Sequence, residues 1–459
     1  MMRSARSALL TRRSLLARGA LGGAALLLGD GALEQSSAAG DPFAAYPALN
    51  PAVINEHAHL NVWLAPELAN HPAYRTAIGI FQRKYAHISV SVTPVAIGDI
   101  PTRLKIAVAS SSNSVIPDLV SYHGYALGAQ GLAQECDFLW AAWGQESAFL
   151  PAAMADVTWR LNKFGIPLVG NAVVTILNAD LFERAHVSLP GAGTSFAQFT
   201  NAVSAVKRAT GTPYGMILSG DPAIVTAVVH ANGGSLLETQ AISGRNLQLL
   251  SDSKVVDAVR FFTELGWRLH LAPIPPMVSN PLYTVQLFAN RRAPAFFGTL
   301  SDLALINQLD NKLRVTVAPL PGGTTGRTSG SVNDGYSLVV VADPLFPQRH
   351  PHAAFELAKW LVARPPAIAV AESLHYAPTV TSYYNDPFFH RDANTAAYFA
   401  AARDAQPIAL DAYPNAFDLY TQALRACFAG GDAARQLRAV AGQAQSFMDK
   451  ADAGLDADG

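Results

Sequence analysis

The segment from Phe164 to Val187 constrains the fold of this chain more than any other stretch of its sequence. It begins near Ile166-Pro167, and the residue before a proline is biased toward extended backbone. Residues 173–176 read Val-Val-Thr-Ile, a β-branched run typical of a strand, and Asn178 follows as a candidate helix cap. This pattern fits a strand that leaves one globular unit and starts the next. It fits equally well a buried strand inside a single α/β domain.

Composition limits the class of protein. The chain has 459 residues, more than one hydrophobic core usually supports, so two α/β domains are expected. Half of the residues are hydrophobic and 15% are charged, which excludes a disordered chain. The formal net charge is -1, so the sequence indicates neither a nucleic-acid-binding surface nor an acidic surface for cations. We therefore expect small or neutral partners.

The first 40 residues resemble an export signal. They contain five arginines, all ahead of an uncharged segment, 19–29, that is too short to span a bilayer. The run Thr11-Arg12-Arg13-Ser14-Leu15-Leu16 resembles a twin-arginine export signal, and Ser37-Ala38-Ala39 offers a small-residue cleavage site. No cysteine follows the apolar segment, so no lipid anchor is expected, and the Pro- and Ala-rich stretch 41–56 predicts a linker. We expect export to the periplasm or the extracellular space.

A parallel α/β unit is predicted after the linker, because short strand-like segments alternate with segments of helical spacing. These segments are 60–64, 74–85, 88–93, 104–108 and 117–120. In open parallel sheets, ligands bind beyond the carboxyl ends of the strands. Trp63 and the loop Tyr122-His123-Gly124-Tyr125 would project there, so they are candidate ligand contacts, although single aromatic residues at such places also pack within their own domain.

Catalytic motifs are scarce. The sequence contains neither a G-x-S-x-G nor a G-x-x-x-x-G-K-[ST] signature. His57 and His59 alternate and could share a metal in a metal-dependent hydrolase, but they precede their strand, whereas such pairs act at the carboxyl end. Cys136 and Cys427 are far apart, and both a disulfide and two buried free thiols are compatible with the sequence. We expect no metal or other cofactor and no enzymatic activity.

Eight short motifs, each weak alone, are spaced along the chain after the leader. They are Val62-Trp63, Pro117-Asp118-Leu119-Val120, Gly165-Ile166-Pro167, Leu177 to Phe182, Ala231-Asn232-Gly233-Gly234, Val317 to Gly322, Tyr336 to Val341 and Ala353 to Leu361. In this order and spacing they resemble the extracellular solute-binding proteins of sugar-type ABC importers, the family of maltose-binding protein. The resemblance extends over nearly the whole chain after the leader.

This resemblance implies a two-lobed α/β fold of the periplasmic-binding-protein type, in which each lobe is a mainly parallel sheet flanked by helices. The chain would cross between the lobes near 169–173, 332–337 and 377–381. Lobe one would comprise residues 57–170 and 335–378, and lobe two residues 171–334 and 379–459. Gly335 would supply a hinge glycine at the second crossing.

The same resemblance implies that a ligand binds between the lobes. Trp63 and the loop after the third strand would form the rim of lobe one, Asn171 would lie on the first crossing, and Asp118 matches the family as a structural strand-end residue. The candidate ligand-binding residues are Trp63, Tyr122, His123, Tyr125, Asn171, Gly298, Thr299, Asn333, Asp334, Tyr336 and Tyr376.

One position departs from the family pattern. Leu300 stands where the family often has a tryptophan that stacks on a sugar ring, which argues against a large oligosaccharide but leaves a smaller sugar or polyol. The resemblance therefore implies a monomeric protein that captures a small polar ligand, a carbohydrate, and delivers it to a membrane permease. A non-sugar ligand such as a phosphodiester or a vitamin remains open, and so does a signalling role. The candidate positions contain no Arg or Lys, which disfavours phosphate.

Overall fold

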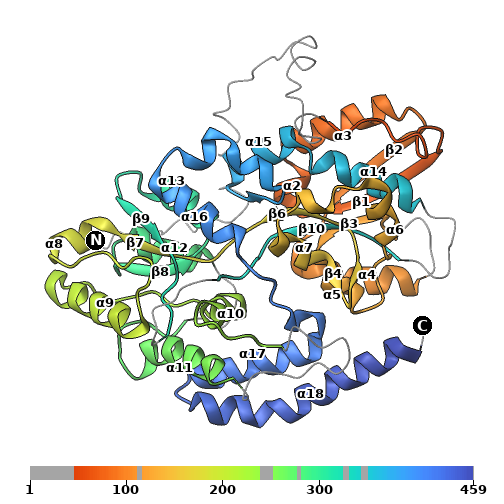
Figure 1. Ribbon diagram of the computed structural model, residues 1–459. Helices are drawn as coiled ribbons and strands as arrows, with labels where there is room; N and C mark the ends of the chain where they lie inside the picture. Colours follow the sequence, from red (N-terminus) through yellow and green to blue (C-terminus); the bar gives the residue numbers. More distant parts are fainter. Residues whose placement is uncertain are drawn as a thin grey trace, which may run out of the picture.

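The computed structural model describes residues 46–110, 116–237, 252–275, 281–323, 330–342 and 350–457. The predicted export signal, 1–40, lies outside these residues, and so does the first part of the predicted linker, 41–45. The rest of that stretch packs on the folded body, because Val53 is fully buried and the Tyr46 ring stacks on Trp360 with centroids 5.1 Å apart. Two β-sheets with helices packed on both faces form an α/β fold (Figure 1).

The larger sheet has six strands. In spatial order they are β11 (Ala377–Pro378), β6 (Ile166–Gly170), β10 (Tyr336–Val340), β3 (Leu119–Tyr122), β1 (Ala58–Leu64) and β2 (Ile88–Pro94). β1 runs parallel to β2 and to β3, whereas β10 is antiparallel to β3 and β6, and β11 is antiparallel to β6. The central strand β6 is buried along its whole length, which explains its almost uninterrupted apolar sequence.

Successive residues of the central strands face two separate hydrophobic cores, as the period of a strand requires. Leu338 of β10 belongs to a core that contains α3 (Pro72–Lys84) and α14 (Pro351–Leu361). The next residue, Val339, belongs to a core that contains α4 (Ile100–Ala109). The larger sheet is therefore covered on both faces.

The smaller sheet has three strands in the order β8 (Ala295–Gly298), β7 (Val174–Asn178) and β9 (Val315–Ala318), and both of its strand pairs are antiparallel. Every residue of the central strand β7 is buried, in agreement with its β-branched sequence. Asn178 then caps α8 (Ala179–Arg184), because its side chain accepts a hydrogen bond of 3.1 Å from the Leu181 amide.

Helices cover both faces of the smaller sheet (Figure 1). One face carries α9 (Phe196–Thr210) and α11 (Ser253–Trp267), and the other carries α12 (Pro281–Ala289), α13 (Leu300–Leu309) and α16 (Ala393–Arg403). The last two helices, α17 (Pro414–Phe428) and α18 (Ala433–Ala457), pack against α11 and against each other.

The remaining elements are further helices and two short strands that pair with each other as a separate antiparallel sheet. They are α2 (Pro66–Ala69), α5 (Gly124–Gly128), α6 (Asp137–Trp143), α7 (Pro151–Val157), α10 (Pro222–Ala231), α15 (Arg364–Leu374), β4 (Thr158–Trp159), β5 (Asn162–Lys163), η1 (Ile97–Asp99), η2 (Glu146–Ala148), η3 (Thr381–Asn385), η4 (Pro387–His390) and η5 (Leu410–Ala412).

The chain passes between the two sheets three times. It goes from β6 to β7, returns from β9 to β10, and leaves β11 for α16, which packs on β9. The first two passages lie so close together that a Cβ on Gly335 would be 2.0 Å from the Val169 carbonyl oxygen and 2.7 Å from the Gly170 Cα. Glycine is required at position 335 because no side chain fits between these two backbones.

The expectation that each sheet is mainly parallel is wrong. Among the paired strands of the described residues, parallel pairing occurs between β1 and its neighbours β2 and β3, and both pairs of the smaller sheet are antiparallel. The reason lies in the crossings. β6 leads out of the larger sheet toward the smaller one, and β10 enters the larger sheet from the smaller one. Because β10 lies beside β6, the two strands run in opposite directions.

Two further observations concern the whole chain. Cys136 and Cys427 are both buried and free, so they do not form a disulfide, and burial raises the pKa of the Cys427 thiol to about 12. Among the helices of the described residues, none is both long and apolar enough to cross a bilayer.

The first prediction concerns the crossings. Gly335→Ala should lower the free energy of unfolding by on the order of 3 kcal/mol, because the new methyl group meets backbone that cannot rotate away. Differential scanning calorimetry of the purified protein measures this change.

Gly442→Ala is the matched control. No atom lies within 4 Å of a Cβ at this position of α18, so the substitution should stabilise the helix by about 0.5–1 kcal/mol. Equal melting temperatures for the two variants would contradict the account of Gly335.

Candidate functional site

Asp334, which directly precedes the second-crossing glycine, marks a recess in the protein. Its side chain is exposed to solvent, yet the surrounding protein desolvates it and, together with the charges of Asp221, Asp411 and Asp302, raises its pKa to about 7 against an opposing effect of His123. Protein therefore surrounds a side chain that water still reaches. The charged groups that act on it belong to segments far apart in the sequence. We refer to Asp334, His123, Asp221, Asp302 and Asp411 as the Asp334 recess.

Backbone hydrogen bonds fix Asp334 in place. Its amide donates to the Asn171 carbonyl oxygen over 2.8 Å, and the Asn333 Oδ1 accepts from the amides of Asn171 and Gly335, both at 3.1 Å. Tyr398 Oη donates to Asn171 Oδ1 over 2.7 Å. The predicted ligand contacts Asn171 and Asn333 are both buried, and these side-chain oxygens hold the crossings together.

Two predicted aromatic residues lie together beside the second and third crossings. The hydroxyl groups of Tyr336 and Tyr376 both donate to Glu67 Oε1, over 3.0 and 3.2 Å, and their rings meet edge to face with centroids 5.8 Å apart. The charge of Asp334 acts on both phenols, so the pair borders the recess. Glu67 thereby orients both rings, of which Tyr336 is half-buried and Tyr376 is buried.

The loop after β3 contributes a second group of predicted residues. Tyr125 and His123 are buried, and Tyr122 is half-buried, with its ring centroid 5.3 Å from that of His123. Tyr125 Oη donates to Asp411 Oδ1 over 2.5 Å, and His123 Nδ1 lies 2.8 Å from Asp156 Oδ1. The loop therefore contacts α7 through Asp156 and η5 through Asp411, and η5 lies far from the loop in the sequence.

Asp411 reaches this place through an unusual turn. Ala409, two residues before Asp411, has φ 61° and ψ -41°. This conformation costs a residue with a side chain about 1–3 kcal/mol. Burial raises the pKa of Asp411, and the nearby charge of Asp156 acts in the same direction, whereas His123 and the bond from Tyr125 lower it. The hydrogen bond from Tyr125 therefore fixes the Asp411 carboxyl group, and the strained backbone at Ala409 is an energetic cost of that placement.

Gly298 is the last residue of β8, and Thr299 directly precedes α13. Both are buried, and Thr299 caps the helix, with its amide donating to Asp302 Oδ2 over 2.8 Å. Burial raises the pKa of Asp302 to about 6, although the bonds from Thr299 lower it. This cap explains how Asp302 comes to face Asp334.

Trp63 is half-buried near the carboxyl end of β1, where it pairs with Val120 of β3 and packs against the hydrophobic core. Its backbone is therefore close to the β3 loop, as its strand position predicted. Asp118 has the structural role expected of it, because its Oδ2 accepts a hydrogen bond of 2.8 Å from the Asn61 amide.

The histidine pair of the hydrolase hypothesis has other partners. His59 Nδ1 lies 2.7 Å from Ser89 Oγ and its Nε2 3.1 Å from Ser91 Oγ, while the His57 ring stacks on His87 with centroids 4.2 Å apart. Within the described part of the chain, no group of three His, Cys, Asp or Glu side chains could hold a metal ion. The geometry therefore gives the hydrolase hypothesis no support.

Sequence reasoning missed several polar residues around the recess. They are Glu67, Asp156, Asp221, Asp302, Tyr398 and Asp411. Only two had a local signal, since Asp221 precedes Pro222 as a helix cap and Asp302 follows Thr299 at capping-box spacing. The others come from segments far apart in the sequence, and only the fold brings them together.

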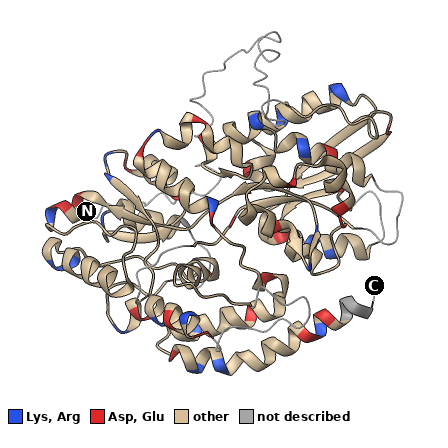
Figure 2. Cartoon of the chain, viewed as in Figure 1, with Lys and Arg blue, Asp and Glu red and all other residues tan. Residues whose placement is uncertain are grey.

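Basic residues lie mainly away from the recess. Figure 2 shows Lys and Arg on outer helices such as α3, α9 and α18. Among the charged groups that act on Asp334, His123 is the one that favours its ionised form. Among the described groups that act on Asp334, three are carboxyl groups that accept hydrogen bonds when ionised, and His123 is the potential cation.

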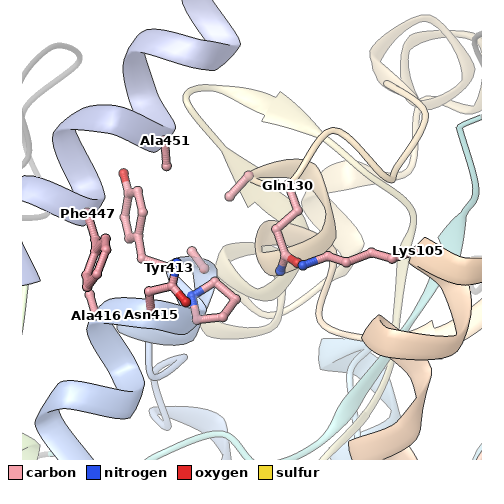
Figure 3. A pocket seen from close by; sticks show the side chains of 10 residues that line it. Lys105, Gln130, Tyr413, Asn415, Ala416, Phe447 and Ala451 are labelled. Atoms are coloured by element: carbon pink, nitrogen blue, oxygen red, sulfur yellow. The ribbon is translucent and has the colours of Figure 1, made fainter. Parts of the chain in front are cut away.

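A second hollow lies between α4 and α5 on one side and η5, α17 and α18 on the other (Figure 3). Its volume is about 290 Å³, just below the usual range for ligand sites. Lys105 and Gln130 line one side, and Tyr413 and Phe447 line the other. Most of the other lining residues are alanine or proline, so few polar groups converge there.

Comparison with known proteins identifies the family. The family model described as bacterial extracellular solute-binding protein matches residues 76–397. A search of curated proteins finds no match.

Solved structures share the fold at low sequence identity. The GacH receptor of Streptomyces glaucescens GLA.O, solved unliganded and with acarbose and an acarbose homolog, is 18% identical with a TM-score of 0.71, over 86% of this chain and 99% of that chain. The sugar-binding protein MalE of Xanthomonas citri is 16% identical with a TM-score of 0.71, over 87% and 99%. UgpB of Mycobacterium tuberculosis, solved with glycerophosphocholine, is 15% identical with a TM-score of 0.70, over 85% and 98%. The predicted two-lobed α/β fold is thereby confirmed.

The second prediction uses the charge of Asp334. Its pKa is raised above the ordinary value, so the folded protein binds a proton there that the unfolded chain has lost, and the associated stability disappears as the pH rises through about 7. Asp334→Asn should therefore raise the melting temperature at pH 8 and leave it nearly unchanged at pH 4. The exposed Asp418 on α17 provides the control substitution Asp418→Asn, which should have no such pH dependence. A lower melting temperature for Asp334→Asn at pH 8 would show that the anion is stabilised in the recess.

Proposed function

The chain belongs to the bacterial extracellular solute-binding proteins, and we propose that it captures a small carbohydrate in the Asp334 recess and delivers it to the permease of an ABC importer. The observation that carries this proposal is the meeting of carboxyl groups and aromatic rings at the chain crossings. Asp334, Asp411 and Asp302 come from different elements, and the Tyr336–Tyr376 pair borders them.

The chemistry of the recess suits a polyol. Sugar hydroxyl groups donate hydrogen bonds, which carboxylates accept, and the C–H face of a sugar ring packs on aromatic side chains. Tyr336, Tyr376 and Tyr122 supply such rings, and the half-buried Trp63 would add another. The complexes of GacH with acarbose and the sugar-binding MalE agree with this choice, although sequence identity to them is low.

We assign lobe one to residues 57–170 and 335–378, and lobe two to residues 171–334 and 379–459. In this proposal, a ligand first binds to one lobe, and hinge motion at the three crossings adds contacts from the other. Only contacts that differ between the open and closed forms shift the population toward closure. The closed monomer then docks on the permease, and no covalent bond is made or broken.

Two alternatives are less favoured. UgpB was solved with glycerophosphocholine, but a phosphodiester requires cationic partners, and carboxylates dominate the charges that act on Asp334. A signalling protein would have the same recess, and a binding assay with the membrane permease separates that role from transport. Leu300, which is buried at the start of α13, favours a small sugar over a long oligosaccharide.

The third prediction tests the ligand class. Thermal unfolding should be measured with maltose, D-tagatose, acarbose, glycerol and glycerophosphocholine. A ligand present at ~100 times its dissociation constant adds ~2.7 kcal/mol to the free energy of unfolding. We expect a sugar to raise the melting temperature and glycerophosphocholine to leave it unchanged. The carbohydrate assignment fails if glycerophosphocholine alone stabilises the protein.

Variants locate the site within the same assay. Trp63→Ala should abolish the ligand-dependent shift while the protein still unfolds cooperatively, because a rim contact is lost without a large cavity. Phe138→Ala is the matched aromatic control, since Phe138 is 53% exposed on α6. A full ligand-dependent shift in Trp63→Ala would remove Trp63 from the site.

The fourth prediction concerns export, which we propose proceeds through the twin-arginine pathway. Replacement of both Arg12 and Arg13 by lysine should retain the precursor inside the cell, because lysine keeps the charge but loses the guanidinium group. Immunoblots of cell fractions measure the distribution of the protein. The control is the paired replacement of Arg3 and Arg6 by lysine, which should leave export intact. Normal export of the Arg12 and Arg13 variant would exclude this pathway.

A further inference from the structure

A buried chain of three polar side chains ends at the recess. Ser337 Oγ on β10 donates to Asp156 Oδ2 on α7, and the other carboxylate oxygen, Oδ1, lies 2.8 Å from His123 Nδ1. The exposed fractions of Ser337, Asp156 and His123 are 0%, 1% and 7%. Because the bond to the imidazole is well shielded from water, it fixes both the orientation of the ring and the nitrogen that carries the bonded proton.

The backbone is shaped to permit this contact. His123 is the last residue before α5, and the next residue, Gly124, lies against the end of α7. A Cβ on Gly124 would be 2.8 Å from the Val157 Cα and 3.3 Å from the Asp156 carbonyl oxygen. Only glycine allows α7 to approach closely enough for Asp156 to reach the His123 ring.

Charged and aromatic groups from several elements face His123. Asp156 lies on α7, Asp411 on η5 and Asp334 beside the second crossing, and the rings of Tyr122 and Tyr125 have centroids 5.3 and 5.5 Å from the imidazole. Burial alone would lower the pKa of His123, but the charge and hydrogen bond of Asp156, with the charges of Asp411 and Asp334, raise it to about 9. These surroundings therefore favour the charged form of the ring.

A charged imidazole has two N–H donors. Nδ1–H is bound to Asp156, whereas Nε2 has no hydrogen-bond partner among the residues that the structure describes. The carboxyl groups of the recess accept hydrogen bonds when they are ionised. Above the raised pKa of Asp334, about 7, the charged His123 ring is therefore the donor among these groups. A ligand that pairs with both His123 and the carboxylates needs two kinds of group. One is a hydroxyl or ether oxygen that accepts a hydrogen bond from Nε2–H, and the other is a hydroxyl group that donates to a carboxylate.

We propose that Asp156 and Ser337 are positioning residues that hold the His123 ring in its charged form, so that Nε2–H donates to an acceptor oxygen of the bound ligand. The proposal rests on the carbohydrate-binding function stated above and deepens it. It assigns His123 as the donor that selects a ligand with an accepting oxygen at that point. Asp156 acts only through His123 and does not touch the ligand.

The first test needs no ligand. Long-range proton–nitrogen correlation NMR of protein labelled with ¹⁵N-histidine reports the charge of each of the 12 histidine rings, and His123→Gln identifies the signal of His123. In the wild type the ring should stay doubly protonated to about pH 9. Asp156→Asn should move its titration to lower pH, and Ser337→Ala should move it less in the same direction. The positioning role is refuted if Asp156→Asn titrates as the wild type does.

Asp156→Asn is nearly isosteric, yet the residue is buried, so a second variant protects the test against misfolding. If Asp156→Asn does not fold, Ser337→Ala takes its place with the same expected direction. Asp156→Glu keeps the carboxylate and should retain the charged ring. The exposed Asp418→Asn serves as a control that leaves the His123 titration unchanged.

The second test measures binding. The probe is maltose or, if maltose leaves the melting temperature unchanged, the compound of the panel that raises it most. His123→Gln should weaken its binding about 10- to 100-fold, as loss of a hydrogen bond from a charged donor predicts. Wild-type affinity should fall relative to His123→Gln as the pH rises through about 9, and Asp156→Asn should show that fall at lower pH. The His123→Gln variant retains Asp334, Asp302 and Asp411. The ratio of its affinity to the wild-type affinity at each pH therefore cancels the effect of their titration.

The outcomes separate the two proposals. If a sugar binds but His123→Gln binds it equally well and the Nε2 resonance does not move, the donor role is wrong and the carbohydrate function stands. If no sugar binds but glycerophosphocholine does, the carbohydrate function fails. The NMR titration then still decides whether Asp156 holds the ring charged.

Discussion

The close contact between the first two chain crossings determines much of this structure. Gly335 lies against the backbone of Val169 and Gly170, where a Cβ would overlap a carbonyl oxygen. Around that contact, Asn333 Oδ1 accepts hydrogen bonds from the amides of Asn171 and Gly335, and Tyr398 donates to the Asn171 side chain. These bonds satisfy buried polar groups at the place where the chain leaves one sheet for the other. The geometry of the recess follows from them, because Asp334 is the next residue in the chain.

The recess contains several carboxyl groups whose negative charges repel one another. Burial raises the pKa of Asp334, Asp302 and Asp411, and neighbouring carboxylates raise that of Asp334 and Asp411 further. Ala409 adopts a strained conformation two residues before Asp411. Groups arranged at a cost in stability are characteristic of functional sites. The buried cation His123, fixed through Asp156, partly offsets the negative charge. The capture of a polar ligand would satisfy the remaining donors and acceptors.

The sequence contained enough local information for the elements but not for the site as a whole. In 164–187, the proline-marked start, the β-branched run and the Asn178 cap became β6, β7 and α8. The alternation that predicted a parallel unit was also correct for β1, β2 and β3. The direction of β10 was not predictable from local pattern, because it depends on how the chain returns from the second sheet. Glu67, Asp156 and Asp411 carry no local signal, since their roles come from contacts between segments more than 30 residues apart.

The central claim is that a ligand closes two lobes about the three crossings. Small-angle X-ray scattering measures this most directly, with the protein alone and with the panel compound that stabilises it most. The account predicts a smaller radius of gyration with the ligand, and no such decrease in Trp63→Ala at the same concentration. An unchanged radius of gyration at saturating ligand in the wild type would contradict closure.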